Sequence, residues 1–306
     1  MDAEEYLEDS AGHSPLEVLM SQFSFSKLYA FAMCPRKWYY RYVAGVPDDT
    51  GFLVYGKAVH HGMEVDNLAK LKGVRLKWEN LLEAAVEKLK AESVLKGVEV
   101  KLDIFAKEHA THLQKLEKDG VRASVRPIEG TVEAPFEISL NLKDPKTGEP
   151  EPAGRILGFV DTLSLSETGA REVVDYKSGA RPTYQADSKK SLQFPLYAVG
   201  GKAPQWRVIS FVRGGRQKPT IHVTEPEVLQ QSQLSRVLIF LENTIRQVRA
   251  ALRSGDFPMC SPNAYYCSAE ACAYHGKCYP REYSSLFFSL GEVKPVGTME
   301  KPEWRK

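Results

Sequence analysis

Two aspartates and a lysine lie close to the ends of neighbouring apolar segments. Asp161 ends the segment Gly158-Phe-Val-Asp161, and Asp175 and Lys177 lie in Val173-Val-Asp-Tyr-Lys-Ser-Gly179. Asp175 and Lys177 are two residues apart, so on a regular strand they point to the same face. Carboxylates hold a hard divalent cation that activates water, and a lysine orients that water or offsets charge on a phosphate. These residues could hydrolyse a phosphodiester, although an exposed aspartate and a surface lysine before a turn give the same short pattern.

Three further polar side chains could complete such a site. Gln193 and Tyr197 are four residues apart, which places both on one face of a helix. They could position the lysine or a phosphate oxygen, or simply form the polar side of a half-buried helix. His60 follows Gly56-Lys-Ala-Val59, and a neutral imidazole is a good ligand for Mn²⁺ and a tolerable one near Mg²⁺. A histidine on a helix is often structural, but the small Gly56 and the apolar Val59 favour a helix that buries the His60 side.

Cysteines gather near the C-terminal end of the chain. Cys267, Cys272 and Cys278 lie close together, whereas Cys34 is far upstream and Cys260, the fifth, is expected to be a free thiol. No secretion signal is evident, so disulfides are not expected. No close Cys-x-x-Cys pair exists, which favours an iron–sulfur cluster on four thiolates over a zinc finger. Zinc and buried free cysteines are the alternatives.

The bulk composition is that of a soluble globular protein. Of 306 residues, 43% are hydrophobic and 26% charged. The net charge of +2 includes an acidic N-terminal stretch, so the rest of the chain is more basic and mildly favours polyanions. There is no apolar stretch long enough to span a bilayer, and we expect a cytoplasmic protein.

Hydrophobic periodicity predicts helices first and strands afterwards. Helical spacing covers 24–42, 54–71, 78–95 and 102–116, whereas apolar residues alternate in 131–142, with Pro135 indicating an edge strand or a bulge. Strands at 155–165, 172–176, 206–212 and 220–223 and helices at 188–199 and 226–253 follow. This order predicts an α/β fold with a mixed central sheet flanked by helices. We expect an acidic disordered tail at 1–23, one domain at 24–280 with a helical insertion at 62–125 and a cysteine segment at 260–280, and a C-terminal tail at 281–306.

Six short motifs, in this order, resemble the RecB-like branch of the PD-(D/E)XK nuclease superfamily. The similarity is to the iron–sulfur exonucleases related to Cas4, the AddB nuclease domain and phage exonucleases. The motifs are Ser26-x-Leu28 with Cys34-Pro35, Gly56-x-x-Val59-His60, Gly158-x-x-Asp161, Asp175-Tyr-Lys177-Ser-Gly179, Gln193-x-x-x-Tyr197 and Tyr266-Cys267-x4-Cys272-x5-Cys278. The resemblance implies a restriction-endonuclease-like fold with an Fe–S clasp.

The resemblance also implies roles for individual residues. His60, Asp161, Asp175 and the Tyr176 carbonyl would bind Mg²⁺ or Mn²⁺, and Lys177 would be the catalytic lysine. Gln193 and Tyr197 would complete the site. A 4Fe–4S cluster would be held by the thiolates of Cys34, Cys267, Cys272 and Cys278.

The function implied is a metal-dependent DNA exonuclease that acts on single-stranded DNA or duplex ends. Its setting would be DNA repair or recombination, phage DNA processing or CRISPR adaptation, in a bacterial, archaeal or phage-infected host cell. No Gly-x-x-x-x-Gly-Lys-Ser/Thr motif is present, so unwinding would need a helicase or a Cas-type protein partner. The alternatives are a non-catalytic DNA-binding adaptor module, against which the acid pair and Lys177 argue, and a zinc-stabilised protein without a nuclease role. The oligomeric state is left open.

Overall fold

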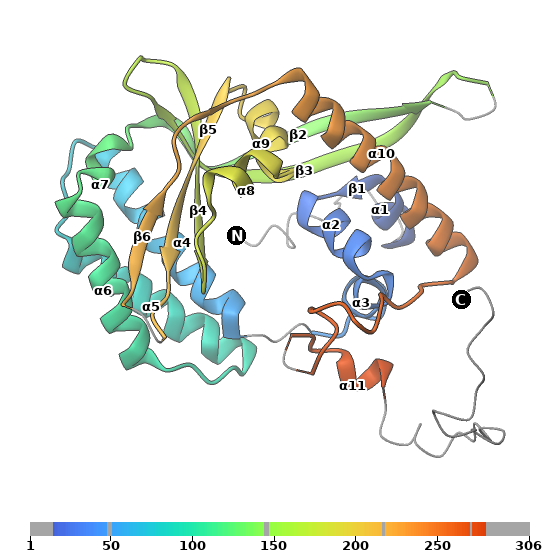
Figure 1. The fold of residues 1–306 in the computed structure, drawn as a ribbon, viewed down its shortest axis with the longest axis horizontal. Coiled ribbons are helices and arrows are strands. Elements are labelled where there is room, and N and C mark those ends of the chain that lie inside the picture. Colours follow the sequence, from blue (N-terminus) through green and yellow to red (C-terminus); the bar gives the residue numbers. More distant parts are fainter. Residues whose placement is uncertain (1–14, 48–50, 144–146, 216–217, 270, 280–306) are drawn as a thin grey trace, which may run out of the picture. The chain divides into compact units, whose positions relative to one another are not determined.

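The structure, a computed structural model, describes residues 15–47, 51–143, 147–215, 218–269 and 271–279. It divides into two compact units, residues 1–260 and residues 261–306. The first unit holds a mixed sheet in the order β1-β3-β4-β5-β6, with β2 paired to β3 and β7 paired to β5 (Figure 1). Its strands are β1 Gln22–Phe23, β2 Pro127–Lys143, β3 Pro150–Leu165, β4 Arg171–Gly179, β5 Gln205–Val212, β6 Thr220–Val223 and β7 Glu227–Val228. The expected α/β fold with a mixed central sheet is confirmed.

Helices lie on both faces of this sheet. They are α1 Pro15–Ser21, α2 Phe25–Met33, α3 Pro35–Trp38, the π-helix η2 Tyr39–Val43, α4 Gly51–Leu71, α5 Trp78–Lys96, α6 Leu102–Lys118, α7 Val121–Ser124, α8 Gln185–Lys190, α9 Gln193–Gly200 and α10 Gln231–Ser254. Figure 1 shows α4 to α7 beside β4, β5 and β6, whereas α10 runs past α1 and α2. The described part of the second unit contains α11 His275–Cys278. No helix among the described residues combines the length and the apolar character needed to cross a membrane.

Side-chain alternation along β4 and β5 divides the core into two clusters. Val174 and Tyr176 of β4 pack with Ile209 and Phe211 of β5 under α4, α5 and α6. Val173, from the other face, packs in a cluster that includes residues of α2, α9 and α10. Residues 62–125, which we expected as a helical insertion, therefore supply the apolar cover of one sheet face.

Two predicted helices are interrupted. The helix predicted at 24–42 begins as expected, with Ser24 accepting a hydrogen bond from the Lys27 amide at 3.2 Å, but α2 ends at Met33 and Pro35 starts α3. Proline has no amide hydrogen and fits the first turn of a helix, which explains the break. The helix predicted at 188–199 is likewise split into α8 and α9. Residues 15–23, which we placed in the N-terminal tail, form α1 and β1, and residues 1–14 lie outside the described residues.

Candidate active site

Asp161 and Asp175 lie where two paired strands separate. The β3–β4 pairing runs as far as Thr162–Val174, and the two aspartates are the next residues beyond that pair. The amide of Tyr176 donates a hydrogen bond of 2.7 Å to Asp161 Oδ2. The two carboxylates thus lie at the fork where β3 and β4 stop pairing.

Lys177 is held against Asp175. Its Nζ lies 3.0 Å from Oδ1 and 2.8 Å from Oδ2 of Asp175, which confirms that the two side chains share a face. Burial alone would lower the pKa of Lys177, but the charges of Asp175 and Asp161 outweigh it and raise that pKa above its usual value. Lys177 is therefore a protonated donor beside the acids, and its Nζ also lies 5.6 Å from the centre of the Phe194 ring.

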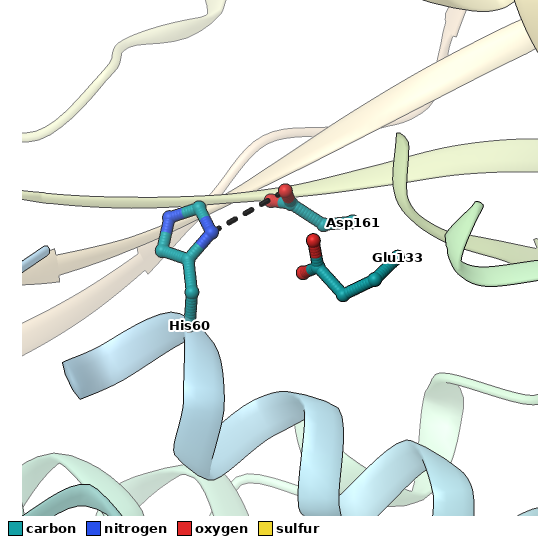
Figure 2. Close-up of side chains that lie close together, drawn as sticks. All are labelled: His60, Glu133 and Asp161. Atoms are coloured by element: carbon teal, nitrogen blue, oxygen red, sulfur yellow. Dashed lines mark ion pairs between the residues drawn. The ribbon is translucent and has the colours of Figure 1, made fainter. Parts of the chain in front are cut away.

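His60 reaches the same site from α4. Its Nδ1 lies 3.3 Å from Asp161 Oδ1 (Figure 2). One turn earlier, a Cβ added at Gly56 would lie 3.5 Å from Ser178 Oγ, so the helix passes close to the end of β4 at a residue without a side chain. The adjacent His61 pairs with Glu64 at 2.9 Å. Of the two adjacent histidines, His60 thus faces Asp161, and its role as a metal ligand remains a prediction.

Glu133 is a site residue that the motifs did not reveal. Its neighbours Val132 and Ala134 pair with Thr162 and Val160, so Glu133 lies opposite Asp161 across the β2–β3 pair. Its φ is +48°, just beyond a register shift between Pro127 and Val132. Figure 2 shows its carboxylate next to that of Asp161. Ligand atoms of His60, Glu133 and Asp161 all lie within 4.8 Å of one another.

The electrostatics of this group fit a divalent cation. Like charges directly opposite each other on two strands are unfavourable unless something neutralises them. Burial, together with the Asp161 charge, raises the pKa of Glu133 to about 8. Burial likewise raises the pKa of Asp175 to about 6 against the opposing effect of Lys177. Asp161 offsets the burial of His60 and raises its pKa to about 9. Burial thus disfavours the charge of Glu133 and of Asp175, and a dication bound by oxygen and imidazole ligands would offset that charge.

Gln193 and Tyr197 flank the lysine from α9. Burial raises the pKa of the Tyr197 hydroxyl, although the nearby Lys177 and Gln193 oppose this. The Tyr197 ring packs edge-on against Phe136 at 5.5 Å. A Cβ at Gly158 would lie 2.5 Å from Phe136, so the glycine of the Gly158-x-x-Asp161 motif makes room for the ring behind Tyr197.

The predicted site residues divide into those the structure gathers and those it leaves apart. His60, Asp161, Asp175 and Lys177 come together, and the Tyr176 backbone lies between the two β4 side chains. Asp175 stays outside the 4.8 Å group and pairs with Lys177. Its role as a metal ligand, like that of the Tyr176 carbonyl, remains a prediction.

The predicted thiolate ligands fall in different units. Cys34 belongs to residues 1–260, where its Sγ accepts a hydrogen bond of 3.4 Å from the Lys37 amide. Cys267, Cys272 and Cys278 belong to residues 261–306. All five cysteines are free of disulfides. Among the described residues, no group of three or more ligand atoms within 4.8 Å includes a cysteine.

The fold expected from the sequence agrees with the family that the chain matches. The family model of the PD-(D/E)XK nuclease superfamily matches residues 22–279, and the chain belongs to this superfamily. A structure named "Putative exonuclease" from Eubacterium rectale is similar, with a TM-score of 0.51, 12% identity and coverage of 87% of this chain and 92% of that one. The structure of SSO0001 gives a TM-score of 0.34, 13% identity and coverage of 89% and 93%. No curated protein sequence matches the chain.

Proposed function

We propose that the protein is a Mg²⁺- or Mn²⁺-dependent deoxyribonuclease that degrades single-stranded DNA or duplex ends as an exonuclease. The observation that carries the proposal is the convergence of His60, Glu133 and Asp161 beside the Asp175–Lys177 pair. An oxygen-rich set with one imidazole suits Mn²⁺ or Mg²⁺. When bound, such a cation polarises the phosphate and lowers the pKa of water.

The side chains around the cation position have separable tasks. Lys177 is protonated and can donate to a phosphate oxygen or orient the attacking water. Both carboxylate oxygens of Asp175 contact Lys177 Nζ and fix the lysine beside the other acidic residues of the site. Tyr197, with Gln193 and the Phe136 ring behind it, limits the movement of this part of the site.

We also propose that Cys34, Cys267, Cys272 and Cys278 hold a 4Fe–4S cluster with a structural role. Four thiols without disulfides are a suitable donor set, and the Lys37 amide supplies the N–H···S bond that often supports a metal-bound sulfur. We further propose that the protein processes DNA in the cytoplasm together with a helicase or a Cas-type protein partner.

The nuclease proposal is tested on anaerobically purified protein with end-labelled linear and circular DNA, single-stranded and duplex. We expect cleavage that requires Mg²⁺ or Mn²⁺, is lost in Lys177→Ala and spares circles. Cleavage of circles would refute exonuclease action. The absence of cleavage by folded wild-type protein on every substrate would favour the DNA-binding adaptor instead.

The cluster has a test of its own. We expect the broad visible absorbance of a thiolate-bound iron–sulfur centre, with iron and sulfide in the purified protein. Cys272→Ala should abolish the absorbance and lower the thermal stability, whereas Cys260→Ala should leave both unchanged. Zinc without iron or sulfide would overturn the iron–sulfur assignment and leave the nuclease proposal standing.

A further inference from the structure

Tyr184 is an exposed aromatic residue close to the candidate site in sequence. It precedes α8, its side chain is 53% exposed, and its ring meets that of His222 at 5.3 Å and 68°. An exposed aromatic ring that is held by a second ring but leaves a face to solvent is an available stacking surface.

The strand register places this ring pair on the same sheet face as Lys177. Lys177 pairs with Ser210 of β5, and Ser210 pairs with His222 of β6. Paired residues project from the same face, and Ile221 and Val223 pack into the cluster on the opposite face. The three residues therefore form a row across three strands. Two strand spacings put the Lys177 and His222 backbones about 10 Å apart.

The segment after β4 is fixed to this row. The Thr183 amide donates a hydrogen bond of 3.0 Å to Ser210 Oγ, which holds the segment in the middle of the row and Tyr184 at its outer end. Exposed cations, Arg181, Lys189 and Lys190, lie on the same stretch of chain. Basic residues interleaved with an aromatic platform are typical of surfaces that bind single-stranded nucleic acid.

We infer that Tyr184, supported by His222, is a base-stacking subsite for a nucleotide near the scissile phosphate of single-stranded DNA. The inference rests on the proposed function, which names DNA as the substrate. Of the two forms of DNA proposed there, the subsite favours the single-stranded one. A base inside a duplex is already stacked on both neighbours, so the ring offers its face to a base that is free of the stack.

The test measures binding of a labelled single-stranded oligonucleotide by fluorescence anisotropy without divalent metal, so that no cleavage is involved. We expect Tyr184→Leu to weaken binding about tenfold, within the range for one base–aromatic stack. Tyr184→Phe, which keeps the ring, should bind as the wild type does. Tyr29→Leu, at a 46% exposed tyrosine that packs on Phe25 and Phe240, is the matched control and should also be unchanged.

A scan of single abasic positions locates the subsite. In the wild type, removal of the base at one position should lower the affinity for the oligonucleotide. In Tyr184→Leu, removal of the base at that position should leave the affinity unchanged. Equal affinity of Tyr184→Leu and wild type, or equal losses on single-stranded and blunt duplex DNA, would overturn the inference. If the protein cleaves DNA but Tyr184→Leu binds single-stranded DNA as the wild type does, the subsite is rejected and the nuclease proposal stands. Tyr184-dependent binding without cleavage would keep the subsite and reject the nuclease.

Discussion

Glu133 and Asp161 face each other across an antiparallel strand pair, which is a costly placement for two carboxylates. Their nearness to His60 makes the arrangement favourable once a dication is bound. The proposed metal-binding role would account for a glutamate held at φ +48° in a strand.

Glu133→Gln should weaken Mn²⁺ binding at least about tenfold, because even changes outside the ligand sphere of a metal commonly cost that much. Isothermal titration of metal-free protein with Mn²⁺ in the absence of DNA measures this. Glu137→Gln is the matched control, since Glu137 lies on the same strand and pairs with Arg155 at its exposed edge. Equal Mn²⁺ affinity in Glu133→Gln and wild type would remove Glu133 from the ligand set.

Motif spacing could not have found Glu133. The turn expected at Asp144 to Gly148 closes with Lys143 opposite Pro150, a register that would place Glu133 opposite Val160. The register shift between Leu140 and Asn141 is what moves Glu133 opposite Asp161. The motifs identified Asp161, Asp175, Lys177 and His60 because each keeps its place within a local pattern. Glu133 depends on the register between strands, which local patterns do not encode.

At the scale of elements, α4 is tied to β4 by a buried hydrogen bond. Asn67 Nδ2 donates to the Tyr176 hydroxyl at 3.1 Å, and both residues are almost fully buried. Asn67 lies two turns after His60 on α4, and the Tyr176 amide orients Asp161. The bond therefore fixes the helix that carries one candidate ligand against the strand that orients another.

Tyr176→Phe should weaken Mn²⁺ binding by roughly tenfold, as expected for a group that orients ligands. In a His60→Ala background the same change should have little further effect, because the hydroxyl acts through the helix that carries His60. Tyr55 also lies on α4, and its hydroxyl is hydrogen-bonded to the Lys101 backbone. Tyr55→Phe removes this hydroxyl and therefore controls for general loosening of α4. Equal losses with and without His60 would indicate a purely structural role.

Element positions were predictable where one periodicity holds over a long stretch. Trp78 starts both the predicted helix and α5, and the strands at 206–212 and 220–223 correspond to β5 and β6. The breaks at Pro35 and after Lys190 were missed because apolar spacing continues across them. Local backbone chemistry, the missing amide hydrogen in the case of Pro35, overrides the hydrophobic pattern there.

At the scale of the whole molecule, one buried cation makes the stability of the fold depend on pH. Lys27 is 2% exposed, and its Nζ donates to the Gln22 carbonyl at 3.2 Å and lies 5.5 Å from the centre of the Tyr42 ring. Burial lowers the pKa of Lys27 from 10.5 to about 8. The unfolded chain therefore binds more protons than the folded chain between these two values. The contribution of Lys27 to the free energy of unfolding should rise with pH across that window.

Lys27→Met tests this dependence, because it keeps most of the buried volume and removes the titrating amine. The variant should be more stable than the wild type at pH 7, by up to roughly 3 kcal/mol from the size of the pKa change, and the difference should shrink as pH approaches 10. Urea unfolding from pH 7 to 10 measures it, with Lys190→Met as the control at an exposed lysine. A constant difference between Lys27→Met and wild type across this range would show that Lys27 stays charged in the folded protein. Its ammonium would then be stabilised by the Gln22 carbonyl and the Tyr42 ring as fully as by water.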